Sequence, residues 1–145
     1  MSDAAPPYPP QITVARVHEL HAAALAHAGG TPGVRDQGLV KAAVGGALTA
    51  AHYHERENDD DPVDPMVIAA YLLCYLARDH AFIDGNKRVA WLACEDQLRL
   101  VRVRIVASDD EAERLVLAVV AKELEANDVI EWIAARLMAY DPTPE

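Results

Sequence analysis

Apolar residues recur at every third or fourth position through most of this chain, with polar residues between them. That spacing places the apolar side chains on one face of an α-helix. Helices are predicted to begin after Thr13, Asp36, Asp64, Gly85, Ser108 and Asp128. Asp64-Pro65 and Ser108–Glu111 match the patterns of a capped helix start and a capping box. The pattern therefore predicts an all-α, single compact domain of about six helices.

Four segments depart from this helical pattern. Residues 1–12 are rich in proline and are expected to be extended or disordered, which leaves residues 13–141 as the helical domain. The polar stretch 51–64 contains three consecutive aspartates and is expected to be a solvated or disordered loop. Residues 100–106 alternate between apolar residues and arginine, which indicates a short strand or an extended connection. The last helix is expected to end near Asp141-Pro142.

Composition and charge narrow the class of protein. Of the 145 residues, 52% are hydrophobic and only 6% are aromatic, which favours a helical interior of Ala, Leu and Val. The net charge of −10 disfavours direct contact with nucleic acid or with an anionic membrane surface. The longest apolar run, residues 67–77, is too short to span a bilayer. No membrane or nucleic-acid partner is therefore expected.

The two cysteines and the first ten residues indicate in which cellular compartment the protein is expected. Cys74 and Cys94 fall inside predicted helices without the short spacing of a zinc site, so we expect buried free thiols. Residues 1–10 contain neither a basic segment nor an apolar run typical of a secretory signal. A cytoplasmic protein is the resulting prediction.

The densest chemistry lies between two of the predicted helices, from His80 to Arg88. Histidine changes its charge near neutral pH, so His80 is suited to take a proton from an attacking hydroxyl. Asp84 offers the hard oxygen ligand that Mg²⁺ prefers beside nucleotide phosphates. Gly85 permits a positive φ, and the helix predicted to start near Asn86 presents unpaired N–H groups to an anion.

Two cations and an aromatic residue complete the stretch. Lys87 and Arg88 add positive charge that can bind phosphate oxygens. Phe82 is expected to pack the loop onto the core. A simple polar helix-capping loop would explain one or two of these residues, but it does not explain the whole set. The combination predicts a phosphate site with a base beside it.

The pattern His80-x-Phe82-x-Asp84-Gly85-Asn86-Lys87-Arg88 resembles the signature of the Fic/Doc superfamily, and Lys87 resembles its Doc (death-on-curing) toxin branch. The Gly33-x-Arg35-Asp36 stretch extends the resemblance. The resemblance to this superfamily implies ATP and Mg²⁺ as cofactors and a Fic/Doc-like helical fold. Its implied site residues are catalytic His80, Asp84, Lys87 and Arg88, nucleotide-binding Gly85, Asn86, Lys87 and Arg88, and the metal ligand Asp84.

Two reactions are known in the superfamily, and the resemblance leaves both open. Lys87 favours the Doc reaction, transfer of the γ-phosphate of ATP to a protein hydroxyl, with elongation factor Tu as the known target. Gly85 belongs to the pattern of members that transfer AMP. Trp91 and Leu92 stand where each class has a further phosphate contact. A member that only binds a nucleotide or a partner is the third alternative.

The resemblance also implies partners. A flap in related proteins docks the target by strand pairing, and residues 51–64 occupy the corresponding place here. The chain shows no Ser/Thr-x-x-x-Glu-Gly/Asn inhibitory motif, so an antitoxin supplied in trans is expected. Separately, His18 and His21 are three residues apart and could suit a metal. A solvated or capping role is favoured because no third ligand is near in sequence.

Overall fold

The computed structural model describes residues 9–56, 58 and 60–141 of the 145-residue chain. Its elements are α1 (Val14–Ala28), α2 (Gln37–Tyr53), α3 (Pro65–Asp79), α4 (Asn86–Arg99), β1 (Val103–Ile105), α5 (Asp109–Val120), α6 (Ala126–Ala134) and β2 (Leu137–Ala139). Six helices and one two-stranded sheet make up this described part of the chain. The all-α prediction of about six helices is confirmed.

Most helices start where the capping residues predict. The side chains of Thr13, Asp36, Asp64 and Ser108 each accept a hydrogen bond from a backbone N–H in the first turn of the following helix. These bonds satisfy donors that the helix itself leaves unpaired. The helix starts therefore follow from local sequence.

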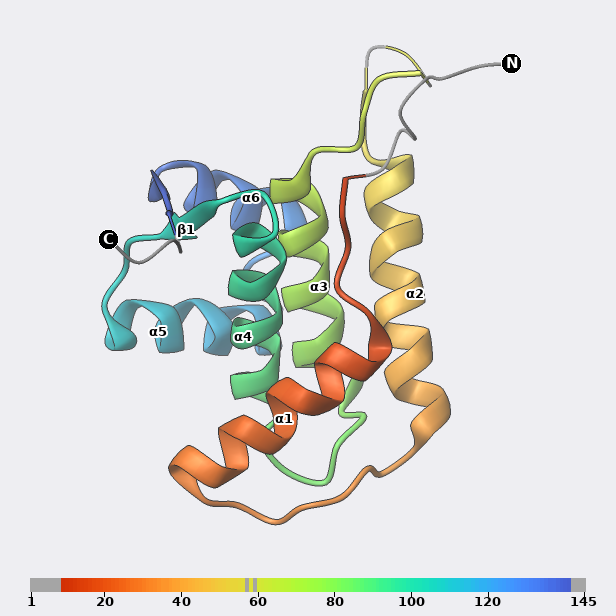
Figure 1. The fold of residues 1–145 in the computed structure, drawn as a ribbon, viewed down its shortest axis with the longest axis vertical. Helices are drawn as coiled ribbons and strands as arrows, with labels where there is room; N and C mark the ends of the chain where they lie inside the picture. Colours follow the sequence, from red (N-terminus) through yellow and green to blue (C-terminus); the bar gives the residue numbers. More distant parts are fainter. Residues whose placement is uncertain (1–8, 57, 59, 142–145) are drawn as a thin grey trace.

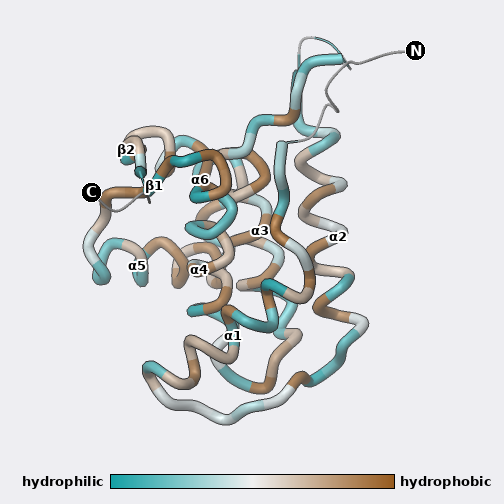
Figure 2. Tube along the Cα trace, viewed as in Figure 1, coloured by the Kyte–Doolittle hydropathy of each residue, from teal (hydrophilic) through white to brown (hydrophobic). Residues whose placement is uncertain are grey.

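Helix α3 is the centre of the fold. It packs against α2 and α4 and also contacts α5 and α6, while α1 crosses α4 at one end (Figure 1). Several α3 residues are fully buried, among them Ile68, Leu72 and Leu73. The loop between α2 and α3 is mostly hydrophilic (Figure 2), as its sequence predicts. Because α3 is surrounded, its two ends are the places where its backbone can be reached.

The C-terminal part differs from the prediction. Helix α6 is capped one turn earlier than expected, by a reciprocal pair in which Glu125 is the N-cap and Asp128 stands at the third helical position. It also ends early, at Ala134, so the predicted helix to residue 141 is wrong. Residues 137–139 instead pair antiparallel with residues 103–105. That pairing gives their backbone groups partners outside a helix and confirms the strand predicted within 100–106.

Burial explains the state of both cysteines. Cys74 and Cys94 are buried and free, as predicted. Burial raises the pKa of the Cys74 thiol to about 11 and also raises the pKa of Cys94. Separately, none of the helices within the described residues has the length and apolarity needed to cross a membrane.

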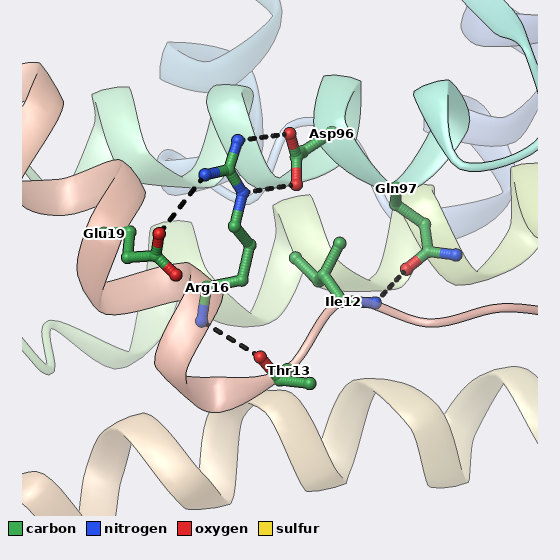
Figure 3. A network of polar contacts seen from close by, with 6 residues as sticks. All are labelled: Ile12, Thr13, Arg16, Glu19, Asp96 and Gln97. Atoms are coloured by element: carbon green, nitrogen blue, oxygen red, sulfur yellow. Dashed lines mark hydrogen bonds and ion pairs between the residues drawn. The ribbon is translucent and has the colours of Figure 1, made fainter.

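A polar network fastens the start of α1 to α4 (Figure 3). Arg16 donates to both carboxylate oxygens of Asp96, at 2.9 Å each. Gln97 is fully buried, where its Oε1 accepts from the Ile12 N–H at 3.1 Å and its Nε2 donates to the Pro10 carbonyl at 2.8 Å. The segment before α1 is therefore held by protein contacts. The expectation for residues 1–8 lies outside the described residues.

Gln97→Leu should lower the free energy of unfolding by about 2 kcal/mol, because leucine keeps the volume but leaves the buried Ile12 N–H and the part-buried Pro10 carbonyl unpaired. Urea unfolding measures the change. The control is Glu19→Gln, which removes an exposed ion pair with Arg16 at 3.6 Å and should cost less than about 0.5 kcal/mol. Equal effects of the two substitutions would contradict this account of Gln97.

Candidate active site

His80 lies where the sequence places it, at the C-terminal end of α3. It is the C-cap residue and adopts a left-handed conformation, with φ 50° and ψ 44°. This conformation ends the helix and turns the chain into residues 80–85, here called the motif loop. The His80 side chain is exposed and forms no hydrogen bond with the residues that the structure describes. It is free to meet a substrate.

Phe82 anchors the motif loop, as predicted, with only 2% of its surface exposed. The Asn86 side chain closes the loop above it: Oδ1 accepts from the Phe82 N–H at 3.0 Å, and Nδ2 donates to the Phe82 carbonyl at 2.9 Å. This structural role of Asn86 was not predicted. Its contact with a phosphate stays a prediction, for which the backbone N–H and the second Nδ2 hydrogen remain.

The start of α4 has the form of an anion site. Gly85 is the N-cap with φ 79° and ψ 12°, a left-handed conformation that glycine adopts without strain. The N–H groups of Asn86, Lys87 and Arg88 then open the helix, where no earlier carbonyl of the helix can accept from them. The Lys87 and Arg88 side chains are exposed on this same turn. Helix dipole and side-chain charge both favour a phosphate here.

Asp84 is held by two backbone donors. Its Oδ1 accepts from the Gly85 N–H at 2.8 Å, and its Oδ2 accepts from the Thr31 N–H at 3.1 Å. These bonds hold the pKa of the Asp84 carboxyl below its ordinary value. The described residues contain no group of three metal-ligating side chains. An ionised Asp84 fits Mg²⁺ as one protein ligand, with phosphate and water supplying the others.

Residues 29–36, between α1 and α2, lie along the motif loop. The N–H of Arg35 donates to the Ala81 carbonyl at 2.8 Å, and the N–H of Ile83 donates to the Gly33 carbonyl at 3.1 Å. Val34 and Phe82 form an isolated antiparallel bridge. Farther along, Arg88 donates to the Gly29 carbonyl at 3.3 Å. The 29–36 loop is therefore the loop that lies beside the site.

The placement of a flap in residues 51–64 is therefore wrong. The loop between α2 and α3 lies at the other end of α3 from the motif loop (Figure 1). The physical reason is the direction of α3, which begins at Pro65 and delivers the chain to His80 a whole helix length away.

His21 is the site residue that sequence reasoning missed. It is buried, with 6% of its surface exposed, and its ring stacks on Phe82 with centroids 3.8 Å apart. Its Nε2 lies 2.8 Å from the Asp84 carbonyl oxygen. A solvated role is thus wrong for His21, while half-buried His18 meets Phe82 edge-on. The available signal was periodicity, because His21 continues the buried face of Val17 and Ala24.

Comparison with known proteins agrees with this geometry. The model of the family described as Fic/DOC matches residues 11–98, which include α1, the 29–36 loop and the motif. The chain belongs to the Fic/Doc family. It is also 35% identical over 117 residues to Toxin Doc of Mycolicibacterium smegmatis, an alignment that covers 77% of this chain and 81% of the relative. The family match begins at residue 11, well before the Gly33-x-Arg35-Asp36 stretch that carries the resemblance in the sequence.

Two positions of α4 carry an aromatic or aliphatic side chain where the resemblance places a further phosphate contact. Trp91 is partly buried and meets the Trp132 ring of α6 edge-on at 6.0 Å. Leu92 is likewise partly buried against the core. Leu92 has no hydrogen-bonding group, and the side chain of Trp91 is hydrogen-bonded to Glu95. The donors that remain for an anion at the start of α4 are therefore the backbone N–H groups, Lys87 and Arg88.

Gly30→Ala should raise the pKa of Asp84 toward its ordinary value, because an added Cβ would lie 2.9 Å from Oδ2 and disturb the bond from Thr31. A carboxyl-detected NMR titration measures this change. Because the pKa of Asp84 is lowered in the folded wild type, this carboxylate stabilises the fold at pH values above its unfolded-state pKa of about 4. That stabilisation should be lost as the pH falls through the folded-state pKa.

The control is Gly29→Ala. Its positive φ of 79° is also unfavourable to alanine, but an added Cβ would meet nothing within 4 Å. Both variants should therefore lose stability, and only Gly30→Ala should shift Asp84. An equal pKa in the two variants would refute the proposed contact.

Proposed function

We propose that this protein is a Doc-like toxin that transfers the γ-phosphate of ATP to a hydroxyl of a target protein, such as elongation factor Tu, in the cytoplasm. The observation that carries the proposal is the exposed base His80 beside an open helix N-terminus with two cations. Such a site suits a reaction that depends on positioning and on stabilising phosphate charge.

The residues divide the work of the reaction. Phosphate oxygens would accept from the N–H groups that open α4 and from Lys87 and Arg88. Asp84 would hold Mg²⁺, which neutralises phosphate charge when bound. A ring nitrogen of His80 takes the proton of the target hydroxyl while the oxygen of that hydroxyl forms a bond to the γ-phosphorus. The bond from that phosphorus to the β–γ bridging oxygen breaks, and ADP leaves.

Lys87 supports γ-phosphate transfer over AMP transfer. It places a long cationic side chain in the first turn of α4, where AMP-transferring relatives have a small glycine. An ATP bound with its terminal phosphate at this turn brings the reacting phosphorus near His80. Gly85 favours AMP transfer as the second candidate, because it matches the pattern of AMP-transferring members.

The activity of a toxin of this kind has to be regulated by a partner. The similarity to a protein named Toxin Doc supports a cognate antitoxin, supplied as a separate chain, as the partner of this protein. The exposed first turn of α4 is the part of the site that such a partner would have to close.

ATP labelled separately at the α and γ positions distinguishes the reactions. With purified protein, Mg²⁺ and cell extract, we expect a target protein to be labelled only from γ-labelled ATP, because the phosphoryl group moves and ADP departs. Labelling from α-labelled ATP would establish AMP transfer instead. Absence of label from both would favour a protein that binds without catalysis.

His80→Asn should fold and bind ATP with Mg²⁺ but transfer label roughly 10² to 10⁴ times more slowly. Asparagine tolerates the left-handed backbone at position 80 better than alanine and cannot act as the base. His80→Ala should lose activity equally, with somewhat lower stability. The control His27→Ala removes an exposed histidine at the end of α1 and should leave the rate unchanged. Normal transfer by His80→Asn would exclude His80 as the base.

A further inference from the structure

We infer that His21 is a positioning residue that sets the orientation of the peptide between Asp84 and Gly85, and through it the phosphate site at the start of α4. The inference rests on the proposed function for its catalytic consequence. Its structural basis is independent of the reaction: one buried imidazole contacts Phe82 and Asp84 of the motif loop and would meet a Cβ added at Gly85.

The hydrogen bond determines which ring nitrogen carries a proton. The Asp84 carbonyl oxygen can only accept, so Nε2 of His21, 2.8 Å away, must be the donor. Because His21 is buried, breaking this bond would leave its Nε2–H without a partner, which is costly. His21 therefore holds the Asp84 carbonyl toward α1.

Fixing the Asp84 carbonyl also fixes the plane of the peptide between Asp84 and Gly85. In a trans peptide the N–H of Gly85 points away from the Asp84 carbonyl, and here it donates to Oδ1 of Asp84 at 2.8 Å. The same peptide plane thus controls the carboxylate on one side. On the other side it leads into Gly85, after which the three unpaired N–H groups of α4 follow. Rotation of this plane would move both the expected metal ligand and the anion site.

The ring also limits where the loop can lie. His21 stacks nearly parallel to Phe82, with an interplanar angle of 15°. A Cβ on Gly85 would lie 3.5 Å from both Cδ2 and Nε2 of His21, which is van der Waals contact. The imidazole therefore forms the wall beneath Gly85. An aliphatic side chain could replace this packing but not the hydrogen bond.

Two substitutions separate the bond from the packing. His21→Leu keeps an apolar side chain of similar size and removes the donor. His21→Gln carries an N–H donor about as far from its Cβ as Nε2 is in histidine. The control is His18→Leu, which removes the other imidazole touching Phe82, from the same helix, without removing any bond to the loop.

The first measurements need no turnover. Hydrogen exchange at the Gly85 amide and binding of inorganic pyrophosphate, followed by NMR of residues 85–88, are compared after thermal unfolding has shown that each full-length variant folds. His21→Leu should exchange faster and bind pyrophosphate roughly tenfold more weakly, since a misplaced site loses affinity and rate together. His21→Gln should recover most of both, and His18→Leu should match the wild type.

Kinetics with ATP and the protein target complete the test. His21→Leu should lower kcat by roughly 10²-fold with little change in the KM for the target protein, and His21→Gln should restore it to within several-fold. Wild-type exchange and kcat in His21→Leu, or no recovery in His21→Gln, would overturn the inference. If the wild type transfers no label from ATP, the proposed function fails, and the exchange and pyrophosphate results still decide the role of His21.

Discussion

The position of the site depends on the burial of Phe82, which holds the motif loop against the core. A loop that carries a base, a carboxylate and two cations has little reason to stay on the protein, since those groups prefer water. Phe82 supplies the apolar surface that holds it, between the core and the stacked ring of His21. The charged residues around it are therefore displayed from a fixed backbone, and binding need not order them first.

Hydrogen bonding around Phe82 explains why the anion site stays open. Residues outside the motif loop bond its backbone groups. The Asn86 side chain bonds the N–H and the carbonyl of Phe82, the 29–36 loop pairs with Ala81 and Ile83, and His21 donates to the Asp84 carbonyl. Several backbone groups of the loop thus have protein partners. The unpaired donors are concentrated at the start of α4, where a phosphate can use them.

The contacts that position the site extend along α1 to the C-terminal end of α4, where Asp96 and Gln97 lie. His21 can reach the loop only if α1 crosses α4 at the observed place, and the crossing is secured near its start by Arg16, Asp96 and Gln97 (Figure 3). Both helices of that contact belong to the region that the Fic/Doc family model matches. The stability contributed by Gln97 and the position of Asp84 therefore both depend on how α1 packs against α4.

Local sequence by itself determined every helix start except that of α6, together with the left-handed Gly85 and the places of His80 and Asn86 at helix ends. Capping, backbone strain and periodicity act over a few residues, which is why short-range patterns specify these features. Tertiary structure alone decided that residues 29–36 lie along the motif loop, that His21 bonds the Asp84 carbonyl and that residues 137–139 pair with β1. Those features join segments up to 63 residues apart, as His21 and Asp84 are. Their partners depend on how helices cross, which short-range patterns do not specify.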